Sequence, residues 1–219
     1  YEISVRDWSS DVCSSDPMIR SVAGRHPDVP MFLYGHSMGG LITLAYLTGT
    51  PADLRGAVLS ASAVEFAGGP AVARAAAGVL SALVPNLGSV SLDSSLMSRD
   101  PAVVRDYDAD PLNYRGKVRV RTGAEMLATA GRVGASLDRL TLPLLVMHGS
   151  ADKVTVPAGS ERLASQAASS DITLKIYDGF YHELHNEPEQ ERVFGDIVRW
   201  LKEHTCSVQI GRASCRERV

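Results

Sequence analysis

A serine in a glycine-rich turn is the first residue of this sequence whose surroundings suggest chemistry. Ser37 lies at the centre of GHSMGG, which fits the pattern G-x-S-x-G between an apolar run and an apolar helical stretch. A sharp strand-to-helix turn would lift the serine oxygen above a sheet, and we expect Gly35 and Gly39 to lack side chains so that strand and helix can approach. The amide of Met38 could then donate to an oxyanion. A plain glycine-rich turn is the simpler alternative.

A serine hydroxyl becomes a strong nucleophile only when a base takes its proton and an acid orients that base. Asp152, in HGSADKVTVP, and His182, in YDGFYHELHNEP, each follow an apolar run. The order Ser37, Asp152, His182 is the order of the triad in the α/β-hydrolase fold. The sequence therefore predicts Ser37 as nucleophile, Asp152 as orienting acid and His182 as general base.

Other residues compete for these roles. His185 is an alternative base, Asp178 is a second candidate acid that suits a turn better, and Asp152 could instead cap a helix or a turn. Two histidines three residues apart also raise the question of a metal site, but no H-E-x-x-H motif accompanies them. We therefore predict no metal and no cofactor. The remaining histidines near these motifs are interpreted as structural or packing residues: His26, His36 and His148.

The elements that must position the triad alternate along the chain. Apolar runs predict strands at residues 29–34, 54–61, 142–148 and 172–177. Helical spacing predicts helices at residues 17–26, 40–49, 157–168 and 189–204. This alternation predicts a parallel sheet with helices on both faces. The three triad residues each follow a strand, so they converge at the carboxyl edge of that sheet.

An insertion at residues 64–136 interrupts the alternation. It holds a nearly all-apolar, alanine-rich helical stretch at 71–83, a polar segment rich in aspartate, and a helical run at 122–133. An insert of this length between two core strands is most simply a cap over the strand ends. The expected organisation is a hydrolase core with the serine turn at 17–62, a helical cap at 63–137, and a core segment with the acid and base at 138–208.

Composition excludes several functional classes. The chain has 219 residues, 22 basic and 25 acidic side chains and a net charge of −3, so it presents no basic field for nucleic acid. No uncharged apolar run is long enough for a membrane span. Three cysteines are too few and too scattered for a disulfide scaffold or a zinc cluster.

The two ends of the chain have an unusual character. Codons that could encode residues 7–16 resemble a sequencing adapter read in one frame, and those for residues 209–219 resemble the partner adapter. A natural polar tail is the alternative. We expect residues 1–16 and 209–219 to be adapter-derived, which leaves 17–208 as native sequence.

Five segments together resemble monoacylglycerol lipases, particularly bacterial ones: GHSMGG, VPNLGSVSLDSSLMSRD, YDADPL, LLVMHGSADKVTVP and LKIYDGFYHELHNEP. The resemblance runs over residues 29–201 and includes the cap, which varies much more among α/β-hydrolases than the core does. It implies an α/β-hydrolase fold with a helical cap insertion, here lacking its first strands. The family's HG-type loop, which supplies a second oxyanion amide, has no counterpart in the chain.

The resemblance implies hydrolysis of a monoacylglycerol to a fatty acid and glycerol through an acyl-enzyme. Met38 would supply one oxyanion amide, His185 and Tyr107 are candidates for the glycerol end of the pocket, and the apolar cap would admit the acyl chain. The implied partner is a small lipid ester, with transient contact of the cap with a membrane surface. The implied location is cytoplasmic or peripheral membrane, and oligomeric state is left open.

Loss of one oxyanion donor lowers a rate by about 10²–10³. We therefore expect the 219-residue chain on its own to be poorly folded and inactive, while its parent protein is a lipase. Three alternatives stay open for the parent. One is a lysophospholipase or general carboxylesterase with the same triad, another is a peptidase, and the third is a non-catalytic binding protein of the same fold, which would predict a broken triad.

Overall fold

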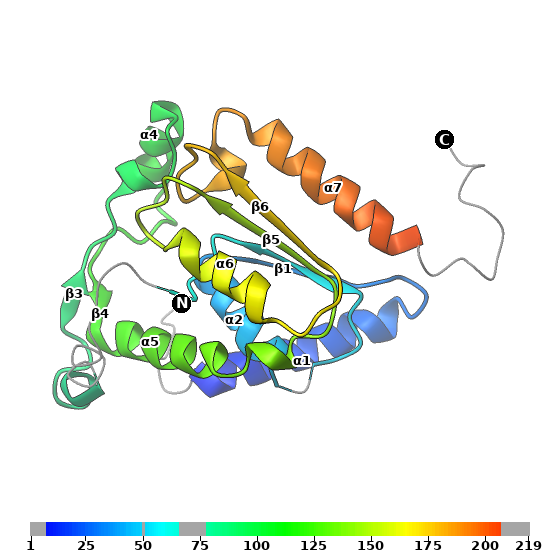
Figure 1. Cartoon of the computed structure of the whole chain (residues 1–219). Coiled ribbons are helices and arrows are strands. Elements are labelled where there is room, and N and C mark those ends of the chain that lie inside the picture. Colours follow the sequence, from blue (N-terminus) through cyan, green and yellow to red (C-terminus); the bar gives the residue numbers. More distant parts are fainter. Residues whose placement is uncertain (1–7, 50, 66–77, 207–219) are drawn as a thin grey trace.

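Four parallel strands form the central sheet of the computed structural model, which describes residues 8–49, 51–65 and 78–206 (Figure 1). The strand order is β1-β2-β5-β6, and each neighbouring pair is parallel. The bounds are β1 (Phe32–His36), β2 (Gly56–Ser60), β5 (Leu144–Gly149) and β6 (Ile172–Tyr177). The predicted parallel sheet is confirmed, and β6 has the predicted bounds.

Helices cover both faces of this sheet, as predicted (Figure 1). One face carries α2 (Met38–Leu47), α5 (Val120–Gly134) and α6 (Pro157–Gln166), with α1 (Trp8–Arg25) packed on α2. The other face carries α7 (Gln190–Cys206).

Alternate strand residues supply the two apolar layers. Leu59 and Val146 pack toward α2, α5 and α6, whereas Val58 and Met147 pack toward α7. All six residues of β5 are buried, because a parallel strand covered on both faces must be apolar on both sides. This continuous burial explains why the run before His148 is uniformly apolar.

The described part of the cap begins with a helical segment at residues 78–83. It continues through β3 (Gly88–Val90), the short helix η1 (Ser94–Leu96), α4 (Pro101–Ala109) and β4 (Val118–Arg119) into α5. β3 and β4 pair antiparallel. In Figure 1, α4 and the β3–β4 pair lie beyond the ends at which β5 and β6 stop.

The cap elements α4, η1 and the β3–β4 pair were not predicted. α4 falls in the segment expected to be only polar, and its start is explained by Asp100, whose side chain accepts from the Ala102 N–H ahead of Pro101 at the first turn. The β3–β4 pair is too short to show a period of two. The predicted helix at 122–133 is confirmed as α5. Residues 71–77 of the predicted helix at 71–83 lie outside the described residues.

The first helix begins at Trp8, so the prediction of a start at Pro17 was wrong. Pro17 lies inside α1, although a proline is more often found in the first turn. Asp16 accepts hydrogen bonds from the Tyr46 hydroxyl at 2.9 Å and from Arg20 Nε at 2.6 Å. Residues 1–7 and 207–219, most of the predicted adapter-derived ends, lie outside the described residues.

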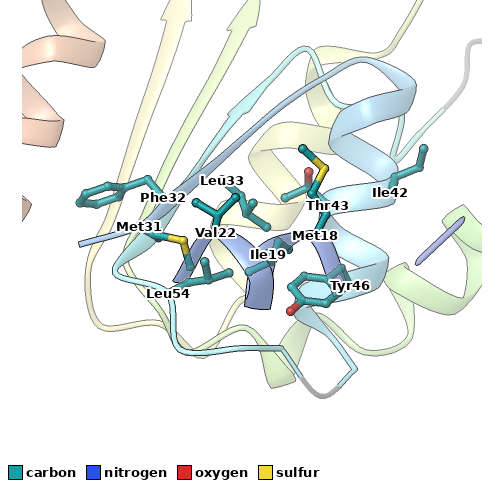
Figure 2. A pocket seen from close by; sticks show the side chains of 10 residues that line it. All are labelled: Met18, Ile19, Val22, Met31, Phe32, Leu33, Ile42, Thr43, Tyr46 and Leu54. Carbon is teal, nitrogen blue, oxygen red and sulfur yellow. The ribbon is translucent and has the colours of Figure 1, made fainter. Parts of the chain in front are cut away.

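An apolar cavity of about 400 Å³ lies between α1, the start of β1 and α2. Figure 2 shows its lining side chains, which include Ile19 and Val22 of α1, Leu33 of β1 and Ile42 of α2. No residue of the predicted triad lines it, so it is separate from the candidate active site. Among the described residues, no helix has the length and apolar character needed to cross a membrane.

Candidate active site

The turn that carries Ser37 joins the end of β1 to the start of α2. Ser37 has φ 52° and ψ −120°, a strained conformation for a residue with a side chain. Its N–H donates to the Ser60 carbonyl at 2.9 Å, which ties the turn to β2. A Cβ at Gly35 would lie 2.8 Å from the Gly39 carbonyl oxygen, so the turn requires glycine there, as predicted.

The expected close approach at Gly39 is not found. A Cβ at Gly39 would meet no heavy atom within 4 Å, whereas a Cβ at Gly40 would lie 2.8 Å from the Cβ of Ser62. The helix therefore approaches the loop after β2 one residue later than the G-x-S-x-G pattern suggests. Met38 is the first residue of α2, so its amide belongs to the helix N-terminus.

The structure brings Ser37, His182 and Asp152 together. His182 Nε2 lies 2.8 Å from Ser37 Oγ, and His182 Nδ1 lies 2.8 Å from Asp152 Oδ2. The three residues follow β1, β6 and β5, which end at the same edge of the sheet. His182 and Asp152 are 4% and 8% exposed, so the hydrogen bond between them is shielded from water.

The Asp152 carboxylate is held by the loop that follows it. Oδ1 accepts from the N–H groups of Val154 and Thr155 at 2.7 and 3.1 Å, and Oδ2 accepts from the Thr155 hydroxyl at 2.8 Å. Burial acts to raise the pKa of Asp152, but hydrogen bonds from His148 and His182, the charge of His182 and the Thr155 N–H outweigh it and hold this pKa below its usual range. The acid therefore stays ionised at neutral pH.

Three imidazole rings meet beside the nucleophile. The His36 ring lies 4.9 Å from that of His182 and 5.1 Å from that of His185, measured between centroids. Burial, followed by the nearby charges of His182 and His185, lowers the pKa of His36 to about 3. Burial also lowers the pKa of His185, with Glu183 opposing this shift. His36 is thus a neutral packing partner of the base, as expected.

The structure also separates the competing candidates. Ser37 Oγ lies within hydrogen-bond distance of His182 Nε2, which favours His182 over His185 as the base. Asp178 is exposed and accepts from the Ser150 hydroxyl at 3.1 Å, next to Gly179 with φ 75°, so it is a turn residue. No cluster of three or more His, Cys, Asp or Glu that could hold a metal occurs in the described parts of the chain.

The cap contributes a polar cavity of about 350 Å³ near the loop that carries the base. Tyr107 of α4 lines it together with Glu183 and Asn186, which flank His185 along the chain. Burial, and then the charges of Glu183 and Asp108, raises the pKa of Tyr107. The two predicted binding candidates, Tyr107 and His185, thus belong to adjoining parts of the cap and the loop after β6.

A connection between the cap and the base was missed by sequence reasoning. The His182 N–H donates to the Leu96 carbonyl at 3.4 Å, and the Glu183 N–H donates to the Met97 carbonyl at 2.7 Å. The Glu187 side chain, fully buried, accepts from Arg99 Nε at 2.7 Å and from the Tyr181 N–H at 2.7 Å. We name the joined segments, residues 96–99 and 181–187, the cap–base tie.

Comparison with known proteins agrees with this geometry. The model of the Hydrolase_4 family, described as serine aminopeptidase S33, matches residues 2–189. The monoacylglycerol lipase of Mycolicibacterium smegmatis is 38% identical over 203 residues, which cover 92% of this chain and 72% of that protein. The chain belongs to the monoacylglycerol lipase family.

Other members of the monoacylglycerol lipase family are also similar to this chain. Human monoglyceride lipase is 38% identical over 86% of this chain and 64% of its own length, so the chain spans less than two thirds of that relative. The crystal structure of Paleococcus ferrophilus monoacylglycerol lipase superposes with a TM-score of 0.76 at 33% identity, covering 88% of this chain and 76% of that one. The predicted α/β-hydrolase fold is confirmed.

Proposed function

We propose that this protein is a serine ester hydrolase that cleaves monoacylglycerols to a fatty acid and glycerol. The observation that carries the proposal is the placement of His182, within 2.8 Å of both Ser37 Oγ and Asp152 Oδ2. This geometry lies in a chain whose relatives include monoacylglycerol lipases at 38% identity. An intact triad disfavours a non-catalytic binding protein of the same fold.

Acylation begins when Ser37 Oγ attacks the ester carbonyl carbon and its proton passes to His182 Nε2. The negative charge on the carbonyl oxygen is stabilised by the Met38 N–H at the start of α2. The bond to the glycerol oxygen then breaks, and His182 gives its proton to that oxygen. Asp152, still ionised, keeps Nδ1–H pointed at its carboxylate and stabilises the positive imidazolium.

Deacylation repeats these steps with water. His182 takes a proton from the water, whose oxygen attacks the acyl carbon. The bond to Ser37 Oγ breaks, and the proton returns from His182 to the serine. The products are a fatty acid and the free enzyme, and no oxidant, metal or cofactor enters the balance.

His185 and Tyr107 are proposed to contact the glycerol end of the substrate. His185 Nδ1 is buried and has no hydrogen-bond partner among the described residues, so a glycerol hydroxyl that reached it would supply the missing partner. Tyr107 lines the adjoining polar cavity. Substitution of either residue is expected to raise KM more than it lowers kcat, because uniform substrate binding is lost.

The cap is proposed to touch a lipid surface. Its exposed large apolar side chains concentrate in one segment, residues 79–92, which contributes Val79, Leu80, Leu83, Val84, Leu87, Val90 and Leu92. We name these seven side chains the cap apolar patch. A substrate dissolved in membranes or micelles would be met by such a patch.

The test is release of glycerol and fatty acid from a long-chain monoacylglycerol by the purified parent protein, because the 219-residue chain on its own is expected to be inactive. We expect turnover that falls at least about 10³-fold in Ser37→Ala. A lysophospholipid, p-nitrophenyl butyrate and an aminoacyl p-nitroanilide run in parallel distinguish the alternatives. Preferential cleavage of one of these would replace monoacylglycerol by a lysophospholipid, a short ester or a peptide as the substrate.

A further inference from the structure

The catalytic acid contacts a second imidazole besides that of the base. Asp152 Oδ2 lies 2.8 Å from His182 Nδ1 and 3.1 Å from His148 Nε2. His148 comes from β5 and is completely buried. The same carboxylate oxygen therefore contacts two imidazole rings, that of His182 from the loop after β6 and that of His148 from β5.

The other nitrogen of His148 determines which of its ring atoms carries the proton. His148 Nδ1 lies 2.7 Å from Ser160 Oγ, and Ser160 is 1% exposed in the first turns of α6. If the serine hydroxyl donates to Nδ1, the ring proton is on Nε2 and points at Asp152. The opposite tautomer would place a lone pair of Nε2 against an ionised oxygen, which is repulsive. The nearby Thr155 hydroxyl, 3.3 Å from Nε2, donates to Asp152 Oδ2 at 2.8 Å.

We propose that His148 is a positioning residue for the catalytic acid. It places Nε2 3.1 Å from Asp152 Oδ2 and 3.3 Å from the hydroxyl of Thr155, which itself donates to the same carboxylate oxygen. This inference rests on the proposed serine hydrolase chemistry. Close polar contacts then form one line from α6 to the nucleophile: Ser160, His148, Asp152, His182 and Ser37. The line holds the same carboxylate oxygen, Oδ2, that contacts the base.

Packing alone does not account for these contacts. β5 is otherwise apolar before Gly149, and an apolar residue in place of His148 would leave the Ser160 hydroxyl buried without this partner. It would also remove one donor from Asp152 Oδ2, so more of the oxygen's charge would act on the His182 N–H. A donor at this position thus spreads the carboxylate charge and limits rotation of its plane.

Substitution by glutamine and by asparagine distinguishes the roles of the two ring nitrogens of His148. In His148→Gln the amide nitrogen can occupy the place of Nε2 and donate to Asp152, whereas in His148→Asn the shorter amide reaches only toward Ser160. His204→Asn is the matched control, because His204 lies on α7 and bonds the Trp200 carbonyl. Ser160→Ala tests the tautomer with the ring retained, and Ser165→Ala, an exposed serine on the same helix, is its control.

The readout is the rate at which a fluorophosphonate modifies Ser37, measured across pH, because this reports the triad without any lipid substrate. We expect His148→Asn to react about tenfold more slowly than the parent, with the acid limb of its profile at higher pH. His148→Gln should regain most of the rate and the parent profile. The rate and pH profile of Ser160→Ala should change in the same direction as those of His148→Asn. Both control variants should match the unsubstituted protein.

Other titratable groups face the base, and they are unchanged in this series: His36 and His185, with Glu183 beside His185. Equal rates and profiles for the Gln and Asn variants, or a Ser160→Ala variant identical to Ser165→Ala, would overturn the role of His148. Thermal unfolding identifies any variant that does not fold, and in that event the Ser160→Ala result decides.

The proposed substrate and the role of His148 can fail separately. If the unsubstituted protein is modified at Ser37 but does not cleave monoacylglycerol, the proposed substrate is wrong and the comparison of the His148 variants still holds. If the parent is not modified, the downfield proton resonance of the His182–Asp152 hydrogen bond gives the same comparison in unreacted protein. An identical resonance in the parent and His148→Asn would then contradict the proposal.

Discussion

Neighbouring glycines on either side of Ser37 differ in what they permit. A Cβ at Gly35 would lie only 2.8 Å from the Gly39 carbonyl oxygen and from the Gly40 Cα. A Cβ at Gly39 would meet no heavy atom within 4 Å. The strained φ of Ser37 is held by two hydrogen bonds, from its N–H to the Ser60 carbonyl and from the Ala63 N–H to its own carbonyl. The conformation of the nucleophile therefore depends on the absence of a side chain at position 35.

Gly35→Ala and Gly39→Ala form a matched pair. We expect Gly35→Ala to lower the free energy of unfolding by about 1–3 kcal/mol, because the added methyl overpacks the turn. Gly39→Ala should leave stability unchanged or raise it by up to about 1 kcal/mol, because alanine favours a helix over glycine. Urea unfolding measures both. An equal loss in the two variants would contradict the assignment of the close contact to Gly35.

Acid stability provides a test of the partly buried His36. Its pKa of about 3 in the folded protein lies below the ordinary value of 6.5, so the unfolded chain binds a proton that the folded chain refuses. Stability is therefore lost as pH falls below about 6.5, with a slope of up to about 1.4 kcal/mol per pH unit, and the loss levels off near pH 3. We expect His36→Asn to flatten the dependence of the unfolding temperature on pH between 7 and 4.

The control for that experiment is His26→Asn. His26 is exposed, so removing it should leave the pH dependence of the parent intact. If His36→Asn and the parent lose stability equally on acidification, the His36 ring is not the group that drives the loss.

At the scale of elements, the cap–base tie is the connection with the largest consequence. Glu187 is buried with its charge, and Arg99 supplies the opposite charge from the cap. Arg99→Met would leave this carboxylate unpaired, and we expect a loss of about 3 kcal/mol in the free energy of unfolding. Slower fluorophosphonate modification of Ser37 should accompany it, because Glu187 also holds the N–H of Tyr181, next to the base.

Glu189→Gln is the matched control for Arg99→Met. Glu189 pairs with the same arginine but is 55% exposed, so its removal should cost less than about 1 kcal/mol. Similar losses in the two variants would mean that the buried carboxylate of Glu187 tolerates the absence of its partner, and that the tie does not depend on charge.

Local pattern was sufficient for the core and insufficient for the cap. Uniform burial makes β5 readable as an apolar run, and the G-x-S-x-G turn places Ser37 whatever the rest of the chain does. Arg99 and Glu187 lie 88 residues apart, so no local pattern in the sequence predicts their contact. Thr155 and His148 contact Asp152 only once the loop after β5 is folded, and a buried histidine reads equally well as packing.

At the scale of the whole molecule, the cap apolar patch is tested by vesicle binding. Leu83 is 73% exposed within the patch, and Leu112 is 90% exposed in the cap but outside it. We expect Leu83→Glu to weaken co-sedimentation with neutral phosphatidylcholine vesicles at least about tenfold, because a buried leucine contributes about 1.5–3 kcal/mol. Leu112→Glu adds the same charge and should bind as the parent does. Equal loss in both would assign the effect to charge.

The cap–base tie also limits how substrate can enter. Residues 96–99 are hydrogen-bonded to the loop that carries His182, so a movement of this part of the cap would also move the base relative to Ser37. The opposite end, residues 78–92, bears the exposed leucines and contacts a different part of the fold: the Pro85 and Leu87 carbonyls accept from the N–H groups of Arg121 and Val120 at the start of α5. A lipid surface that moves this end would therefore act on the start of α5, while residues 96–99 keep His182 beside Ser37.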